Sequence, residues 1–253
     1  MKPYIHVYLS PHLDDVALSC GGRIWQQVQA GERVLVVTTF AGTPGPGAPL
    51  SSFAQELHAR WEHPADAAAR RQDEDLAAWA LLGAEALHWP YSDCIYRQIP
   101  DGRFPYASEE ALWGPVHPAE EGLVAELAAQ LAALPLVRGS TVYAPLGVGH
   151  HVDHQIVHCA AETWGRALVY YEDYPYAKDP QAVQAALEGW QWQAEWVELS
   201  EEALKAKIGA SACYCSQLST FWADVTEMAA AVRAFAEQAG SGGLAERYWS
   251  RQN

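Results

Sequence analysis

Two short segments of the chain carry side chains whose types and spacing could do chemistry. SPHLDDVALSCGG, residues 10–22, contains His12, Asp14 and Asp15, and GVGHHVDHQIVH, residues 147–158, contains four histidines and one aspartate. Neutral imidazole and carboxylate groups together suit zinc, and a catalytic zinc keeps three protein ligands and one open position for water. His12 and Asp15 can supply two ligands from one turn, and a histidine of the second segment would supply the third.

Asp14, the neighbour of the expected ligand Asp15, also has chemistry available to it. A carboxylate beside metal-bound water can accept its proton, which generates a hydroxide able to attack an amide or ester carbonyl. A second histidine near the metal can stabilise the oxyanion and protonate the leaving amine. The two segments therefore predict a metal-dependent hydrolase, provided that the fold brings them together.

Both segments follow predicted strands, and this position gives the fold a way to bring them together. Residues 4–9 alternate as a strand does, residues 16–30 suit a helix, and RVLVVTTF at 33–40 is a continuous apolar run typical of a buried parallel strand. STVYAPL at 140–146 is a further predicted strand. Ligands of parallel sheets bind at the carboxyl ends of the strands, so one crevice could gather both segments.

Strand and helix continue to alternate along the chain. Further helices are expected at 67–82, 120–134, 153–164, 201–211 and 224–238, further strands at 85–90, 167–175 and 189–199, and long loops at 41–66 and 91–118. This alternation predicts an α/β fold of Rossmann-like type, with a mostly parallel sheet, helices on both faces and long active-site loops. With no internal repeat and no linker that demands a division, we expect a single domain over residues 1–253.

Composition narrows the classes of partner and location. Half of the 253 residues are hydrophobic, which supports a sizeable core, and 31 acidic against 16 basic residues give a formal net charge of -15. Such a surface would repel a phosphate backbone, so we expect no nucleic-acid partner. The N-terminus lacks the apolar core of a signal peptide, and no stretch approaches the length of a membrane span, so we expect no membrane contact and a cytoplasmic location. A homo-oligomer is left open.

The five cysteines are too few and too scattered for a disulfide scaffold. They are Cys20, Cys94, Cys159, Cys213 and Cys215. Because no C-x-x-C pair indicates a thiolate metal site, we expect all five to be small, reduced packing residues.

PHLDD followed by a Gly-Gly pair, together with the distant HxDH of GHHVDH, resembles the PIG-L/LmbE-like zinc-dependent de-N-acetylases. Members of that family remove acetyl groups from N-acetylglucosamine-containing substrates. The resemblance implies that His12, Asp15 and His154 bind zinc and that Asp14 is the general base. It also implies that His151 is the oxyanion stabiliser and acid, with Asp153 orienting its imidazole.

The resemblance extends over most of the chain. Arg71 and Glu74 match the family's R-x-x-E, Asp93 falls where its sugar-side aspartate is expected, and YCSQ at 214–217 resembles its Y-x-S-Q. The resemblance therefore implies that Arg71 and Asp93 contact an amino-sugar substrate. Leu13 stands in place of the usual proline and Val16 in place of the frequent glutamate, and neither change removes an expected ligand.

The function expected from the resemblance is removal of an N-acetyl group from an N-acetylglucosamine-containing small molecule or glycoconjugate. Two alternatives share the scaffold: a non-catalytic metal- or sugar-binding protein, and an amidase acting on a bulkier N-acyl group. A nucleotide-binding Rossmann enzyme is a third, although SCGG does not form G-x-G-x-x-G. Zinc is the expected metal, but two histidines and one aspartate also accept iron, cobalt or nickel.

Structural interpretations compete with the chemical ones at individual residues. Asp14 or Asp15 could be an ordinary helix N-cap, Arg71 could pair with Glu74 or Asp75 on a helix surface, and Asp93 could be structural. The roles of His150 and His158 stay open.

The remaining aromatic residues and histidines carry weaker signals. Several aromatic side chains in the two long loops could stack on sugar rings or could only pack the loops: Trp61, Tyr91, Tyr96, Tyr106 and Trp113. Four histidines have no spacing partner that indicates a ligand set: His58, His63, His88 and His117.

Overall fold

A seven-stranded sheet forms the centre of the computed structural model, which describes residues 3–45, 47–60 and 67–252. The strands are β1 (His6–Ser10), β2 (Val34–Thr38), β3 (Glu85–His88), β4 (Thr141–Pro145), β5 (Leu168–Tyr171), β6 (Trp192–Glu198) and β7 (Ala245–Arg251). Their order across the sheet is β3-β2-β1-β4-β5-β7-β6. The first five strands pair in parallel, and β7 runs antiparallel to β5 and β6. The prediction of a mostly parallel sheet is confirmed.

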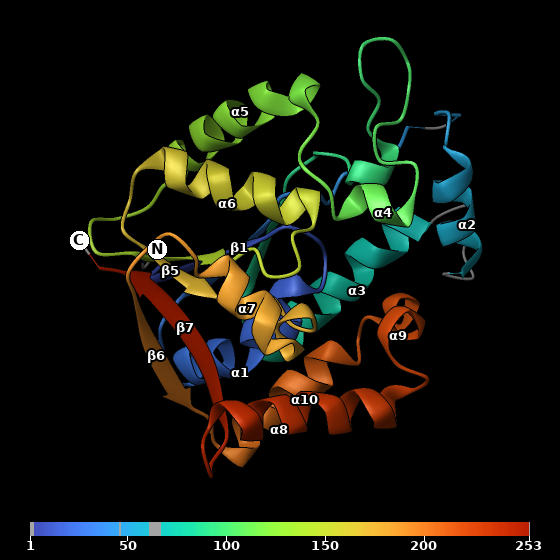
Figure 1. The fold of residues 1–253 in the computed structure, drawn as a ribbon. Coiled ribbons are helices and arrows are strands. Elements are labelled where there is room, and N and C mark those ends of the chain that lie inside the picture. The colour runs from blue at the N-terminus through green and yellow to red at the C-terminus, as the bar shows by residue number, and fades with distance from the viewer. Residues whose placement is uncertain (1–2, 46, 61–66, 253) are drawn as a thin grey trace.

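Helices cover both faces of the sheet, as the alternation of elements predicts. They are α1 (Asp15–Gln29), α2 (Ser52–Arg60), α3 (Ala67–Leu82), α4 (Glu109–Leu112), α5 (Glu121–Ala132), α6 (Val152–Trp164), α7 (Pro180–Ala186), α8 (Glu201–Ser211), α9 (Cys215–Phe221) and α10 (Val225–Ala239). Short 3-10 turns are η1 (Cys94–Tyr96), η2 (Pro118–Glu120) and η3 (Tyr176–Lys178). Helices α5 and α6 pack together on one side of the sheet, while α1, α3 and α8 pack together on the other (Figure 1).

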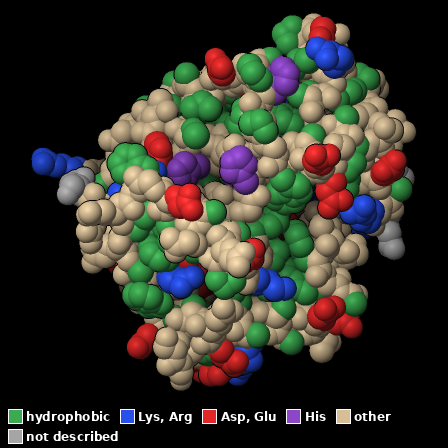
Figure 2. All heavy atoms as spheres, viewed as in Figure 1, with side chains coloured by type: hydrophobic (Ala, Val, Ile, Leu, Met, Phe, Trp, Pro, Cys, Tyr) green, Lys and Arg blue, Asp and Glu red, His purple; other side chains and the backbone are tan. Residues whose placement is uncertain are grey.

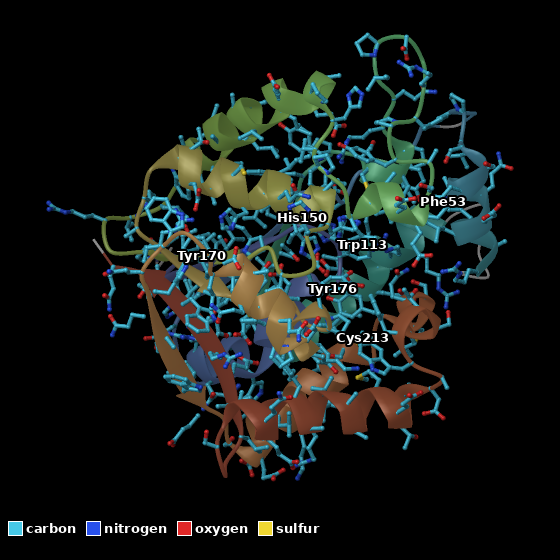
Figure 3. The ribbon with its side chains drawn as sticks, viewed as in Figure 1. Phe53, Trp113, His150, Tyr170, Tyr176 and Cys213 are labelled. Carbon is cyan, nitrogen blue, oxygen red and sulfur yellow. The ribbon has the colours of Figure 1, made fainter. Side chains whose placement is uncertain are left out.

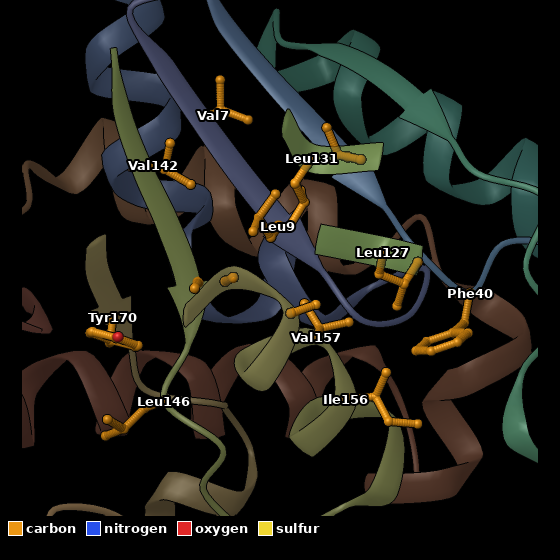
Figure 4. Packing of buried hydrophobic residues seen from close by; sticks show 14 of the residues in the cluster. Val7, Leu9, Phe40, Leu127, Leu131, Val142, Leu146, Ile156, Val157 and Tyr170 are labelled. Atoms are coloured by element: carbon orange, nitrogen blue, oxygen red, sulfur yellow. The ribbon is translucent and has the colours of Figure 1, made fainter. Parts of the chain in front are cut away.

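The alternation of side chains along β1 divides the core into two layers. Val7 belongs to the same buried cluster as Leu127 of α5 and Ile156 of α6 (Figure 4), whereas the next residue, Tyr8, lies in the cluster that contains Trp79 of α3. Successive strand residues point to opposite faces, so both faces of the strand are covered. The same two-sided cover explains the continuous apolar run of β2, all of whose residues are buried.

The order of the strands brings the two predicted site segments together. Strands β1 and β4 are parallel neighbours, so their carboxyl ends lie at the same edge of the sheet. The chain leaves β1 after Ser10 to begin α1 at Asp15, and it leaves β4 after Pro145 to begin α6 at Val152. The connection that follows β1 and the connection that follows β4 therefore lie side by side, although they are distant in sequence.

Several elements differ from the predictions because their stability comes from contacts with distant segments. The predicted loop 41–66 contains α2, of which only Ala54 and His58 are buried, so its sequence shows little helical periodicity; residues 61–66 of that loop lie outside the described residues. The predicted loop 91–118 contains η1 and α4. Helices α7 and α9 and strand β7 were not predicted, and β7 pairs with two strands that precede it by many residues.

The cysteines and the surface add two findings. All five cysteines are free, but Cys159 and Cys215 are exposed, so the expectation that all five are packing residues is wrong for these two. Figure 2 shows hydrophobic side chains at the surface among scattered acidic and basic ones. Within the described ranges, we find no helix whose length and apolarity would allow it to cross a membrane.

A buried ion pair holds α1 at its midpoint. Lys207 of α8 donates from Nζ to Glu246 Oε1 of β7 (2.8 Å) and to the carbonyl oxygen of Ser19 (2.9 Å). Glu246 also accepts from the backbone N–H groups of Gly22 (3.0 Å) and Arg23 (3.1 Å). A Cβ at Gly22 would lie only 3.0 Å from Glu246 Oε1, so the glycine makes this close approach feasible. Helix α1 is thus fixed relative to the C-terminal part of the chain.

We predict that Lys207→Met destabilises the protein by about 3–5 kcal/mol, because it leaves the Glu246 carboxylate buried without its counter-charge. Urea unfolding of the variant and the parent measures the loss. Arg233→Met is the control, since it removes the solvent-exposed pair with Glu201 (2.7 Å) and is expected to change the free energy of unfolding little. Equal losses in the two variants would contradict a special role for the buried pair.

Candidate metal centre and active site

Three of the predicted metal ligands converge at the carboxyl ends of β1 and β4. Asp15 Oδ2 lies 3.3 Å from His12 Nδ1 and 3.3 Å from His154 Nε2. The ring centroids of His12 and His154 are 5.4 Å apart, and Asp15 and His154 are buried. The structure therefore places the two imidazoles on either side of one carboxylate.

The surroundings of His154 fit a bound cation. His154 Nδ1 lies 2.7 Å from Asp173 Oδ1, and Asp173 Oδ2 accepts from the backbone N–H groups of Gly147 (2.8 Å) and Val148 (2.9 Å). A carboxylate that accepts a hydrogen bond from one ring nitrogen selects the tautomer in which the other ring nitrogen keeps its lone pair. That other nitrogen, Nε2, is buried and has no hydrogen-bond partner among the described residues. The donor set of two imidazoles and one carboxylate suits a divalent cation.

His12 has a similar arrangement on the opposite side. Its Nε2 lies 2.8 Å from Asp153 Oδ2, so a proton on Nε2 leaves the lone pair of Nδ1 facing Asp15. Asp153 also accepts from the backbone N–H of Cys94 (3.0 Å) and pairs with Arg97 Nη1 (2.7 Å). Each of the two imidazoles is therefore oriented by a buried carboxylate.

This geometry differs from the contact expected between Asp153 and His151. The backbone N–H of Asp153 donates to His151 Nδ1 (3.2 Å), while its carboxylate contacts His12 and Arg97. The reason is that His151 is the N-cap of α6 and Asp153 lies in its first turn, where backbone N–H groups face the cap. The orientation of His151 thus comes from the main chain.

His151 is placed as a neutral hydrogen-bond donor. Burial lowers the pKa of His151 to about 3, and the neighbouring His12 charge acts in the same direction. Because Nδ1 accepts from a backbone N–H, the neutral ring carries its proton on Nε2. His151 lines the cavity described below, so this proton is available to a bound molecule.

Asp14 is not an ordinary helix cap. It occupies the N-cap position of α1 but makes no side-chain capping hydrogen bond, and its φ of 117° is a strained conformation for a non-glycine residue. Burial raises the pKa of Asp14 to about 8, assisted by the Asp15 charge and opposed by Arg71. A carboxyl group with a pKa near neutrality is suited to accept and release a proton.

A cavity of about 230 Å³ opens over these residues. Its polar lining includes His12, Asp14, Asp15 and His151. Six apolar or aromatic side chains also line it and are called the apolar wall: Phe53, Leu57, Leu112, Trp113, Tyr176 and Phe221. Figure 3 labels three members of this apolar wall, which come from α2, the residue after α4, and η3. The cavity therefore combines reactive groups with an apolar lining.

Arg71 and Asp93 both lie at this cavity. Arg71 Nη1 is 3.5 Å from Asp93 Oδ2, both residues are buried, and both line the cavity. Asp93 also has a structural contact, since its side chain accepts from the backbone N–H of Ile95 (3.2 Å) at the start of η1. Arg71 and Asp93, the expected substrate contacts, thus lie in the lining of the cavity.

The R-x-x-E and Y-x-S-Q motifs meet where α9 packs on α3. Glu74 accepts from both the backbone N–H (3.0 Å) and the hydroxyl (2.6 Å) of Ser216, and Asp75 accepts from the hydroxyl of Tyr214 (2.7 Å). These contacts place the next residue, Gln217, in the lining of the cavity. Glu74 and Asp75 therefore bind α9, and Arg71 pairs with Asp93.

The other histidines lie outside the cluster of ligands. His158 pairs with Glu162 (3.0 Å), and His150 Nδ1 lies 3.2 Å from the carbonyl oxygen of Trp113. Three more make contacts elsewhere: His58 with Tyr96, His88 with Asp75, and His117 with the backbone of η2. His63 and Trp61 fall outside the described residues. None of the five described here joins the pair His12 and His154.

Of the four described residues among the five loop aromatics singled out in the sequence, Trp113 lines the cavity, and its ring meets His151 edge to face at 5.2 Å. Tyr91, Tyr96 and Tyr106 instead hydrogen bond to Glu126, His58 and Glu120, which is loop packing.

Sequence reasoning missed Asp173, Arg97 and Tyr176. Asp173 had a usable signal, because it lies two residues after the end of β5, just as His12 lies two residues after the end of β1. The predicted strand at 167–175 includes Asp173, so the sequence does not mark it as a strand-end residue. Arg97 and Tyr176 had no such signal, since their positions depend on the course of the connections.

We predict that His154→Ala abolishes stoichiometric Zn²⁺ binding measured by titration calorimetry, because the substitution removes one of the three expected ligands. His158→Ala is the matched control, since it lies one turn further along α6 and pairs with Glu162. Its zinc affinity is expected to equal that of the parent. A His154→Ala protein that still binds one equivalent of zinc would show that the ligand set is wrong.

Comparison with known proteins agrees with this geometry. The family model for PIG-L, described as GlcNAc-PI de-N-acetylase, matches residues 7–164. The chain is 29% identical to a 2'-N-acetylparomamine deacetylase of Niallia circulans over 67% of its own length, and 33% identical to one of Streptomyces fradiae over 69%. It spans 66% and 58% of the lengths of these two relatives.

A solved structure extends the similarity to nearly the whole chain. The zinc-inhibited form of teicoplanin deacetylase Orf2 has a TM-score of 0.84 and 29% identity, with 98% of both chains covered. The family model covers more than half of the chain and includes both strand-end segments of the site. The chain therefore belongs to the PIG-L family.

Proposed function

We propose that this protein is a zinc-dependent hydrolase that removes the N-acetyl group from an N-acetylglucosamine-containing small molecule or glycoconjugate. One observation carries the proposal: a strained, buried Asp14 lines the same cavity as His12, Asp15 and the donor His151. A protein that only binds metal or sugar has no need of a base at this position. The activities named for the relatives, deacetylation of 2'-N-acetylparomamine and of teicoplanin, support an acetylated amino sugar as the substrate.

In the proposed ligand set, His12, Asp15 and His154 would hold a divalent cation, which would supply Lewis acidity toward the water and the acyl carbonyl when bound. Two imidazoles and one carboxylate favour zinc among the divalent metals. Within the chain, Asp14 accepts the proton of the attacking water, and the Nε2–H of His151 donates to the carbonyl oxygen as negative charge develops there.

The same residues complete the reaction. The carbon–oxygen bond has formed, and the carbon–nitrogen bond breaks as the amine nitrogen takes a proton. We assign that proton to Asp14, because this residue has accepted the proton of the attacking water and lines the same cavity. The products are acetate and a free amino sugar. His151 thus keeps the oxyanion role that the family resemblance implies, and the role of acid passes to Asp14.

Arg71 and Asp93 are the proposed contacts for the sugar. They lie together at the cavity and offer a guanidinium and a carboxylate to sugar hydroxyl groups. The apolar wall favours a second candidate function, an amidase acting on a bulkier N-acyl group, since such a wall can bury an alkyl chain. We also propose that the chain acts as one domain, because β1 and β7 belong to the same sheet. A cytoplasmic location and homo-oligomerisation stay predictions.

We predict that Asp14→Asn lowers kcat by about 10²–10⁴, because the amide cannot accept a proton, while zinc stays bound. Asparagine is chosen because it tolerates positive φ better than most residues. The assay is acetate release from a panel of N-acetylglucosamine conjugates, with matched conjugates carrying longer acyl chains.

Asp101→Asn serves as the control, since Asp101 pairs with the exposed Arg103 in another part of the molecule. Unchanged turnover in Asp14→Asn would refute its role as base. Faster release of a long acyl chain than of acetate by the parent would favour the amidase.

A further inference from the structure

Arg97 connects the segment between β3 and α5 to the proposed metal ligand His12 through one carboxylate. Arg97 Nη1 lies 2.7 Å from Asp153 Oδ1, and Asp153 Oδ2 lies 2.8 Å from His12 Nε2. The three residues come from the end of η1, the first turn of α6 and the connection after β1. Arg97 itself is not among the residues that line the described cavity.

The guanidinium of Arg97 is held in one orientation. Its Nε and Nη2 donate to the two carboxylate oxygens of Glu120 (2.6 and 3.1 Å), which is the bidentate geometry that fixes an arginine most firmly. Nη1 also donates to the carbonyl oxygen of Ser92 (3.1 Å), and the guanidinium carbon lies 4.8 Å from the ring centroid of Phe40. Glu120 in turn accepts from the hydroxyl of Tyr106 (2.8 Å). The group that meets Asp153 is therefore rigidly placed.

Asp153 depends on this contact because its side chain is fully buried. A buried carboxylate needs compensation at each oxygen, and here Oδ2 accepts from the backbone N–H of Cys94 and faces His12. Oδ1 makes no hydrogen bond among the described residues, so the ion pair with Arg97 Nη1 (2.7 Å) is what compensates its charge. If Arg97 is removed, Oδ1 loses its charged partner and the carboxylate is free to rotate. The imidazole of His12 then loses the acceptor that keeps its Nδ1 directed at Asp15.

We propose that Arg97 is a positioning residue that orients His12 through Asp153 and so sets the affinity of the site for its cation. The inference rests on the proposed role of His12 as a ligand. A competing explanation is that Arg97 only fastens the segment to Glu120. The two explanations separate in their consequences, because fastening alone changes the free energy of unfolding and leaves the affinity for zinc unchanged.

The test measures the Zn²⁺ affinity of Arg97→Met and Arg97→Lys by competition with a chromophoric chelator, alongside urea unfolding. We expect about 10- to 100-fold weaker zinc binding in Arg97→Met, the range typical of losing a group that orients a ligand. Arg97→Lys is expected to recover part of the loss, because it keeps the charge but cannot bind Glu120 and Asp153 together. If Arg97→Met does not fold, the zinc affinity of Arg97→Lys tests the inference in its place.

Arg103→Met is the matched control, since Arg103 belongs to the same segment and pairs with Asp101 (2.7 Å), but its side chain is 76% exposed. Its zinc affinity should equal that of the parent. Asp153→Asn alone and combined with Arg97→Met should weaken binding to a similar extent, because both changes interrupt the same connection.

Three outcomes would count against the inference or against its basis. Parent-like zinc affinity in a folded Arg97→Met protein would overturn the inference, as would additive losses in the double variant. The His12→Ala variant distinguishes a wrong ligand set from a wrong role for Arg97. If His12→Ala binds zinc as the parent does, the proposed ligand set itself is wrong; if it loses zinc while Arg97→Met keeps it, the ligand set stands and the role of Arg97 is refuted.

Discussion

The Asp15 carboxylate between two imidazoles is the arrangement on which the rest of the site depends. It joins His12, in the connection after β1, to His154, in the first turn of α6, and both segments follow neighbouring parallel strands. Each imidazole has a buried carboxylate on its other nitrogen, Asp153 for His12 and Asp173 for His154. With both outer nitrogens engaged, both inner nitrogens are directed at the same point.

The surroundings of the adjacent residues Asp14 and Asp15 shift the pKa values of their carboxyl groups in opposite directions. Burial raises the pKa of Asp14, and the neighbouring Asp15 charge raises it further. Burial also acts to raise the pKa of Asp15, but the contacts with His154 and His12 outweigh it, so the pKa falls well below the usual value. Two carboxyl groups whose environments separate their pKa values can divide the roles of ligand and base. The strained backbone at Asp14 keeps the second group in the cavity.

The central part of the site could be predicted from the sequence because it follows from topology. His12, Asp15 and His154 sit at the ends of strands that parallel pairing must bring to one edge, so their meeting requires no knowledge of loops. The contact of Asp153 could not be predicted in the same way. A residue in the first turn of a helix presents both a backbone N–H and a side chain, and which of them meets His151 depends on the cap geometry.

The parts that escaped prediction are those stabilised by distant segments. Arg97 reaches Asp153 only because Glu120, Ser92 and Phe40 hold its guanidinium, and no local pattern encodes that set. Likewise, α9 is short and is fixed by Ser216 on Glu74, and β7 is fixed by pairing with β5 and β6.

The most direct test of the account is anomalous diffraction at the zinc edge from crystals grown with one equivalent of zinc. The account predicts one strong peak at about 2.0–2.2 Å from His12 Nδ1, a carboxylate oxygen of Asp15 and His154 Nε2. A strong peak held by other residues, or no peak at these three while zinc remains bound to the protein, would contradict it.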